Sequence, residues 1–69
     1  MIEVFRTNIT GKMASRKISE ALHAQFPDLQ VHFDLEDCDR ILRVDGDPLF
    51  PEMIAELVKE KGYDCEMLK

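Results

Sequence analysis

The sequence has little positive charge, and it lacks any long apolar run. Nine Lys and Arg residues stand against 14 Asp and Glu residues, so the net charge is −5. Surfaces that bind nucleic acid or anionic membranes rely on clustered positive charge, and this acidic balance argues against both. No stretch approaches the roughly 18 consecutive apolar residues that a membrane-spanning helix needs. We therefore expect an acidic globular protein with no nucleic-acid or membrane partner.

Cysteine is also scarce, because the chain has only Cys38 and Cys65. Two cysteines do not form the disulfide framework that is typical of small secreted domains. Glu3 and Arg6 interrupt the apolar character of the N-terminal segment, which argues against a secretory signal core and indicates the cytoplasm. No Gly/Ser/Pro-rich linker divides the 69 residues, so residues 1–69 are expected to form a single domain.

The first part of the chain predicts a strand and then a helix. A strand is expected over roughly residues 2 to 9, where two registers stay open. One register buries Ile2 and Val4, and the other buries Phe5, Thr7 and Ile9. A β-bulge within the strand would allow both sets to contribute to the core.

The helix that follows is expected to begin at a cap on Thr10 or Ser15 and to end before Pro27. Its predicted apolar stripe consists of Ala14, Ile18, Ala21, Leu22 and Phe26.

The central part predicts a β-hairpin over residues 31 to 45. Val31, Phe33 and Leu35 alternate with polar residues, as in a strand with one solvent-exposed face. A second apolar run, from Ile41 to Val44, follows the polar turn.

The last part predicts a helix and a short strand. Pro51 suits the first turn of a helix, and Gly62 suits its C-terminal cap. The strand is expected over residues 63 to 68, with Tyr63, Cys65 and Met67 on one face. The expected buried stripe of the helix is Phe50, Ile54, Leu57 and Val58.

The predicted order β-α-β-β-α-β is that of the α+β ferredoxin-like fold. This fold has a four-stranded antiparallel sheet in the order 4-1-3-2, with both helices on one face. It brings the loop after the first strand, the turn around Cys38 and the turn at Gly62–Tyr63 to one end of the molecule. The second strand is an edge, so we expect a monomer or a weak homodimer that pairs through that edge.

The chain resembles the heavy-metal-associated domains of small copper chaperones and metal-transporting ATPases, whose signature is G-M-T-C-x-x-C. Asn8 to Ala14, with the sequence NITGKMA, falls on that signature when the following helical stripes are aligned. Gly46-Asp47-Pro48 and Lys61-Gly62-Tyr63 fall where the family has a Gly-Asp element and a helix that ends in Gly-Tyr. The resemblance covers nearly the whole chain and implies the same fold.

The resemblance places Gly11 and Ala14 at the two metal-binding cysteines of the family. Neither side chain has a ligand atom, and soft metals such as Cu(I) are held by thiolates. The family's metal site is therefore not expected at this loop, and we predict no cofactor.

Other candidate sites have simpler interpretations. Cys65 is expected to be buried and Cys38 to be an exposed thiol whose acidic neighbours oppose ionisation. His23 and His32 are expected on the surface, without catalytic partners. The acidic cluster does not match the EF-hand calcium loop, and we interpret it as a solvated turn. Its members are Asp34, Glu36, Asp37 and Asp39.

The sequence favours a small non-enzymatic module that binds a protein partner of unknown identity. Basic residues that include Lys12, Arg16 and Lys17 lie at the start of the first helix, at the same predicted end as the acidic turn. The alternative function is copper or zinc binding through ligands that the family does not use, such as Cys38 with Met13. The predicted binding residues are Thr10, Gly11, Lys12, Met13, Arg16 and Tyr63.

Overall fold

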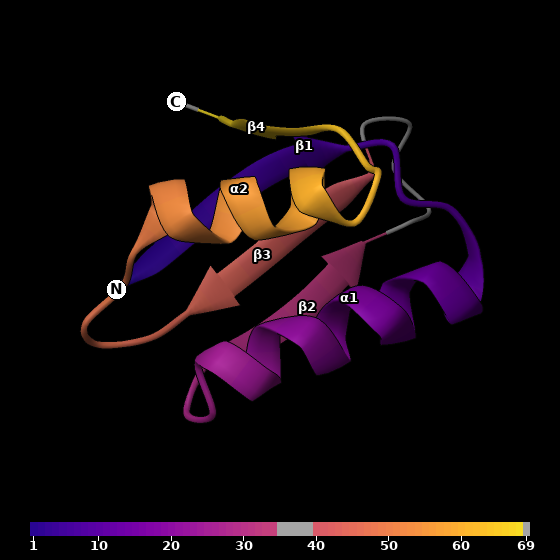
Figure 1. The fold of residues 1–69 in the computed structure, drawn as a ribbon. Coiled ribbons are helices and arrows are strands. Elements are labelled where there is room, and N and C mark those ends of the chain that lie inside the picture. The colour runs from indigo at the N-terminus through magenta and orange to yellow at the C-terminus, as the bar shows by residue number, and fades with distance from the viewer. Residues whose placement is uncertain (35–39, 69) are drawn as a thin grey trace.

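The computed structural model describes residues 1–34 and 40–68, and Figure 1 shows its helices and strands. Residues 35–39, where the sequence predicts the hairpin turn with Cys38, and Lys69 lie outside the described residues. The elements in chain order are β1 (Ile2–Thr7), α1 (Gly11–Gln25), β2 (Gln30–Asp34), β3 (Ile41–Asp45), α2 (Pro51–Glu60) and β4 (Cys65–Met67).

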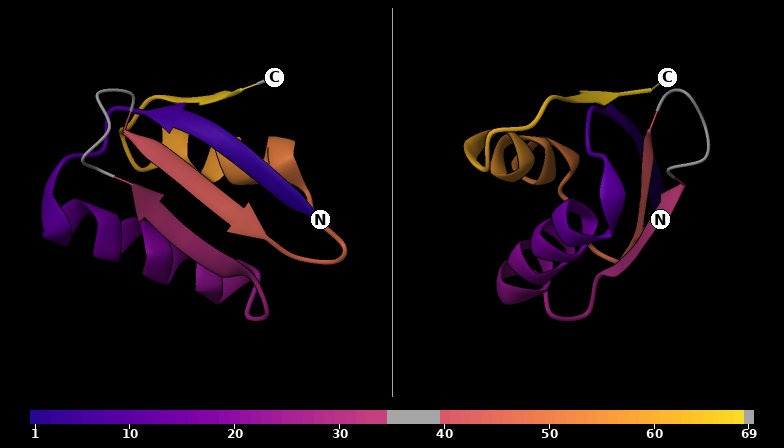
Figure 2. Two further views of the ribbon diagram at one scale, coloured as in Figure 1. Left: turned by 180° about the vertical axis from the view of Figure 1, so that it is seen from behind. Right: turned by 90° about the vertical axis from the view of Figure 1, so that its right-hand side faces the viewer.

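The four strands form one antiparallel sheet in the order β2-β3-β1-β4. Both helices cover one face of this sheet, as the edge-on view in Figure 2 shows. The predicted α+β ferredoxin-like arrangement, including the strand order 4-1-3-2 read from the other edge, is confirmed. The predicted pairing of the second and third strands is also confirmed, with Val31 opposite Val44 and Phe33 opposite Leu42.

Of the two sets of residues that β1 was predicted to bury, the structure buries the second. Phe5, Thr7 and Ile9 are buried, whereas the Ile2 side chain is 62% exposed. Phe5 packs in the layer between sheet and helices, and Ile9 joins the same core from just beyond the strand. The strand itself ends at Thr7, two residues earlier than predicted.

One core fills the space between the sheet and the two helices. Ile18 and Leu22 are the buried residues of α1, as its apolar spacing predicts. Val31 and Phe33 are only partly buried, because β2 is an edge strand. The buried apolar residues are Phe5, Ile9, Ile18, Leu22, Leu29, Leu42, Val44, Ile54, Ala55, Val58 and Cys65.

The ends of the helices follow the sequence signals in part. Thr10 occupies the N-cap position of α1 without a side-chain capping hydrogen bond, and Ser15 lies inside the helix. At the other end, the Phe26 N–H donates to the Leu22 carbonyl at 2.7 Å and the helix stops before Pro27. Gly62 has φ +93°, the left-handed conformation expected of the residue that follows the C-cap of a helix, here Lys61.

Two expectations about the C-terminal part are wrong. Phe50 does not belong to the buried stripe of α2, because it is the N-cap residue with φ −122° and ψ 78°, and its side chain is 45% exposed. Ala55 is buried instead. The last strand begins at Cys65 rather than Tyr63, and Met67 at the sheet edge is 38% exposed.

Candidate functional site

The loop between β1 and α1 begins at a hydrogen-bonded threonine. The Thr7 hydroxyl donates to the Arg40 carbonyl at 2.7 Å and accepts the Ile9 N–H at 3.2 Å. The Thr7 N–H also donates to the Arg40 carbonyl, at 3.2 Å. One side chain therefore ties the start of the loop to the residue that precedes β3.

Ile9 anchors the loop in the core, and the residues that follow it are exposed to solvent. Ile9 is fully buried, whereas Thr10 and Gly11 are exposed. Gly11 has φ +81°, and a Cβ atom placed there would meet no other atom within 4 Å. The conformation of this residue, and not a shortage of space, is what favours glycine at the start of α1.

Asn8 connects this loop to the turn between α2 and β4. Its Oδ1 accepts the Asp64 N–H at 2.8 Å, and its Nδ2 donates to Asp64 Oδ2 at 3.3 Å. The two residues are 56 positions apart in the sequence, so no local pattern predicts the pair. The only local signal is that asparagine is favoured in turns. These bonds confirm that the loop after β1 and the turn after Gly62 lie at the same end.

A second part of the site is the exposed first turn of α1. The Met13 side chain is 88% exposed and shares a shallow surface hollow with Lys12 and Arg16. The first turn of α1 contains no acidic residue. The positive end of the helix dipole and the cations of Lys12 and Arg16 therefore both attract negatively charged groups. Arg16 Nε lies 3.9 Å from Glu20 Oε1 across an exposed helical turn, which binds the guanidinium only weakly.

We call Thr10, Gly11, Lys12, Met13 and Arg16 the loop surface. The structure brings these predicted residues together on one exposed segment. Tyr63, the sixth predicted residue, precedes Asp64 and is half-buried against the core. Its N–H donates to the Val58 carbonyl at 3.3 Å, as part of the turn that ends α2.

The positions that the sequence resemblance aligns with metal-binding cysteines lie within this same turn of α1. Gly11 is its first residue and Ala14 its fourth. Within residues 1–34 and 40–68, no three His, Cys, Asp or Glu side chains are grouped closely enough to hold a metal ion.

Cys65 is buried in β4, as predicted, with 5% of its surface exposed. Burial raises the pKa of its thiol from 9.0 to about 11, against a smaller opposing effect of the positive charge of Lys59. A thiol with so high a pKa stays protonated near neutral pH and is a poor nucleophile and metal ligand. Cys38, the other predicted sulfur ligand, lies outside the described residues.

The two histidines have different surroundings. His32 is exposed on β2, as expected. His23 has partners that the sequence interpretation missed, because its Nε2 lies 2.8 Å from the Leu29 carbonyl and its Nδ1 lies 3.5 Å from Ser19 Oγ. Ser19 precedes it by four residues, the spacing that places side chains on one helical face. The short contact to Leu29 joins α1 to the turn before β2.

None of the helices in the described part of the chain has the length and apolar character needed to cross a membrane.

Comparison with known proteins supports the fold. No protein-family model matches the chain, and no curated protein matches it significantly in sequence. Among solved structures, the solution structure of the yeast copper transporter domain CCC2A, studied in the apo and Cu(I)-loaded states, matches with a TM-score of 0.79. The match covers 99% of this chain and 94% of the yeast chain at 20% sequence identity. The chain therefore has the fold of this copper transporter domain, as the sequence resemblance to heavy-metal-associated domains implies.

Proposed function

We propose that the chain is a small, non-enzymatic protein-interaction module of the cytoplasm, and that it docks its partner through the loop surface together with Tyr63. The observation that carries this proposal is the 88% exposure of Met13 between Lys12 and Arg16. A flexible, polarisable thioether adapts to apolar partner surfaces of different shape. Burying it on binding is favourable because apolar surface leaves water.

The charges around Met13 favour an acidic partner surface. Lys12 and Arg16 are exposed, and their positive charge lies at the N-terminal end of α1. Cations at the rim of an interface chiefly raise the association rate and exclude partners of like charge. The preferred partner surface thus has an apolar depression for Met13 with carboxylates around it.

In this proposal the loop does not carry a metal ion in the way that heavy-metal-associated domains do. The similar yeast structure is that of a copper transporter domain studied with and without Cu(I). Gly11 and Ala14 supply no side-chain donor at the positions aligned with the family's cysteines. This loop therefore lacks the two thiolate ligands through which the family binds a soft metal.

The test compares two variants of the full chain. Met13→Gln removes the apolar tip from the loop surface, and Ile2→Gln makes a comparable apolar-to-polar change at a residue of β1 that is 62% exposed. The wild type and both variants are immobilised, and quantitative mass spectrometry measures which cytoplasmic proteins each one retains. We expect Met13→Gln, but not Ile2→Gln, to lose specific partners. Equal retention by wild type and Met13→Gln contradicts the proposal.

A second candidate function is copper or zinc binding through Cys38 and Met13. Its support is the exposed Met13 thioether, because thioether and thiolate together suit Cu(I). Cu(I) or Zn²⁺ is titrated into the reduced protein while amide and methionine-methyl NMR signals are followed. Submicromolar binding that is centred on Met13 and abolished by Cys38→Ser, but not by Cys65→Ala, would establish this function and displace the docking proposal. An unchanged spectrum removes the metal candidate.

A further inference from the structure

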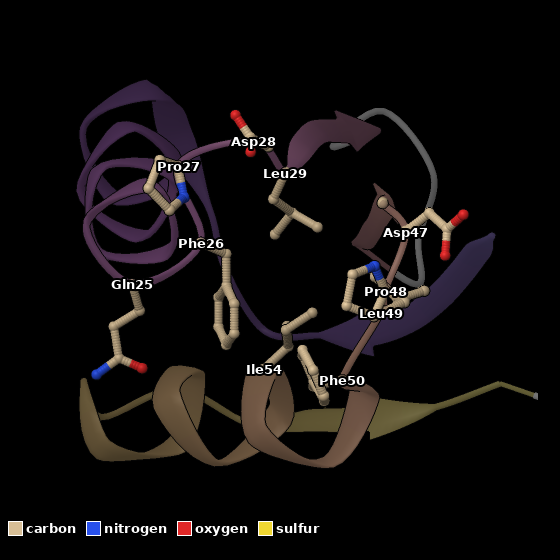
Figure 3. Close-up of a pocket in the computed structure, with 11 residues that line it drawn as sticks. Gln25, Phe26, Pro27, Asp28, Leu29, Asp47, Pro48, Leu49, Phe50 and Ile54 are labelled. Atoms are coloured by element: carbon tan, nitrogen blue, oxygen red, sulfur yellow. The ribbon is translucent and has the colours of Figure 1, made fainter.

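The end of the molecule opposite the loop surface contains a pocket of about 210 Å³. It lies between the turn that follows α1 and the segment that connects β3 to α2 (Figure 3). We call it the distal pocket. Its lining includes Gly46, Asp47 and Pro48, which the family resemblance aligns, but neither the resemblance nor the proposed function assigns it a ligand.

The interior of the distal pocket is apolar. The Phe26 and Phe50 rings stack with centroids 6.2 Å apart and an interplanar angle of 26°. Leu29, Leu49 and Ile54 add aliphatic walls, and Figure 3 shows Leu29, Phe26 and Ile54 directed toward a common space. The pocket remains open because Phe50 caps α2 instead of joining its buried stripe, so that a partly exposed ring forms one wall.

The walls are held by specific contacts. The Leu29 N–H donates to the Phe26 carbonyl at 3.0 Å, and His23 Nε2 lies 2.8 Å from the Leu29 carbonyl. On the other side, a Cβ atom at Gly46 would lie only 3.1 Å from Leu29 Cδ1. Glycine at position 46 therefore lets the two loops approach closely, which makes the pocket a formed feature of the fold.

The mouth of the pocket carries negative charge only. Asp28 and Asp47 are its charged lining residues, and the lining contains no Lys, Arg or His. Their carboxylates lie at the edge and are directed away from the apolar centre (Figure 3). An adjoining surface hollow includes Glu52, Met53 and Met67, and it also has no cationic lining residue. The apolar centre thus has Asp28 and Asp47 at its rim and Glu52 in the adjoining hollow.

We propose that the distal pocket docks a short segment of a partner protein in which one aliphatic or aromatic side chain is flanked by Lys or Arg. The volume is below the roughly 300 Å³ of ordinary small-molecule sites, but it is large enough for one side chain. The flanking cations of the segment reach Asp28 and Asp47 while its apolar side chain enters beside the stacked Phe26 and Phe50 rings, against Leu29 and Ile54. The net charge of −5 attracts such a basic segment from a distance.

The first experiment uses two synthetic peptides with the same central leucine. Acetyl-Gly-Lys-Leu-Arg-Gly-amide is titrated into the full chain, and acetyl-Gly-Glu-Leu-Glu-Gly-amide is the control. We expect saturable NMR shifts of the Leu29 and Ile54 methyl groups and the Phe50 ring with the basic peptide. The basic peptide forms two exposed ion pairs that the acidic peptide cannot form. Its dissociation constant should therefore be about fivefold lower than that of the acidic peptide. Added salt should reduce this difference.

Charge-neutralising variants identify the rim residues. Asp28→Asn and Asp47→Asn change exposed side chains with almost no change in volume, so both variants are expected to fold. The double variant should bind the two peptides equally, whereas Glu56→Gln, which removes an exposed carboxylate elsewhere on α2, should keep the preference.

Three results of the peptide titrations would overturn the proposal. They are absence of shifts at the distal pocket, equal binding of both peptides by the wild-type protein, and shifts confined to the loop surface. Concentration-dependent shifts of pocket residues without peptide, abolished by Met13→Gln, would identify a second copy of the chain as the occupant and would also overturn it.

Discussion

The Asn8 side chain binds both the backbone and the side chain of Asp64, through Oδ1 to N at 2.8 Å and Nδ2 to Oδ2 at 3.3 Å. This pair joins the loop that precedes α1 to the turn that follows α2. Because β1 and β4 also pair next to it, with Thr7 opposite Cys65, the contact extends the sheet into the candidate site. It gives the loop surface a fixed position relative to the α2–β4 turn.

Replacing Asn8 by Ala should loosen this end of the molecule without unfolding it. Two exposed hydrogen bonds are lost, and we expect a decrease of about 1 kcal/mol in the free energy of unfolding. Urea denaturation measures the decrease, and hydrogen exchange of the Asp64 amide reports the local opening. Asp64→Asn serves as control because it keeps the backbone N–H donor and a side-chain oxygen that accepts from Asn8 Nδ2. Unchanged exchange at Asp64 in Asn8→Ala would show that the contact does not persist in solution.

The register of β1 predicts a large difference between two isoleucines. Ile9 is fully buried, so Ile9→Ala should lower the free energy of unfolding by about 3 kcal/mol. Ile2 is 62% exposed, so Ile2→Ala should change it by less than about 0.5 kcal/mol. Thermal and urea unfolding of the two variants measure the contrast. Similar losses for both would contradict this register, and a larger loss for Ile2→Ala would mean that β1 buries the other face.

Gly62 should be more sensitive to substitution than its exposed position suggests. Its φ is +93°, and a Cβ atom there would meet nothing within 4 Å. Gly62→Ala should therefore destabilise the fold by about 1 kcal/mol through backbone strain alone. Gly62→Asn should cost less, because asparagine tolerates the left-handed region better than alanine. Urea denaturation measures the free energy of unfolding of both variants. An unchanged value for Gly62→Ala would contradict the left-handed conformation at this position.

The Cys65 thiol should make stability depend on pH in the alkaline range. Burial raises its pKa from 9.0 to about 11 in the folded protein. Below pH 9 both folded and unfolded chains keep the proton, so this group adds no pH dependence. Between pH 9 and about 11 the unfolded chain loses the proton while the folded chain retains it, so the free energy of unfolding falls as pH rises.

Other groups also titrate above pH 9, so the measurement is a difference between two proteins. Urea denaturation under reducing conditions at pH 8, 9 and 10 compares the wild type with Cys65→Ala. The wild type should lose more stability over this range than the variant does. Parallel decreases in the two proteins would show that Cys65 does not titrate as its burial requires.

Much of the fold could be predicted because its signals are local. The spacing of Ile18 and Leu22 and the alternation of Val31 and Phe33 each identify an element from a few neighbouring residues. The burial of β1 could not be predicted in the same way, since both faces carry apolar side chains. Only packing against α1 and α2 decides that Phe5 is buried and Ile2 is not.

The loop surface and the distal pocket show the same division. The exposure of Met13 follows from its place beside Lys12 in the first turn, and the sequence predicted it as a binding residue. The Asn8–Asp64 pair depends on two segments that only the tertiary fold brings together. The distal pocket depends on Phe50 falling one position outside α2, and Pro51 indicates the start of the helix without fixing the direction of the preceding ring.

The left-handed conformation of Gly11 bears on how this loop relates to metal-carrying domains of the same fold. A cysteine introduced at position 11 would bring a thiolate but would also carry a Cβ atom into φ +81°, where side-chain-bearing residues are disfavoured. Installing Cys at positions 11 and 14 therefore strains the backbone at position 11 while it supplies the two ligands. Converting this loop into a thiolate metal site lowers the stability of the fold through that strain, as Gly62→Ala is expected to do at the other end of the Asn8–Asp64 contact.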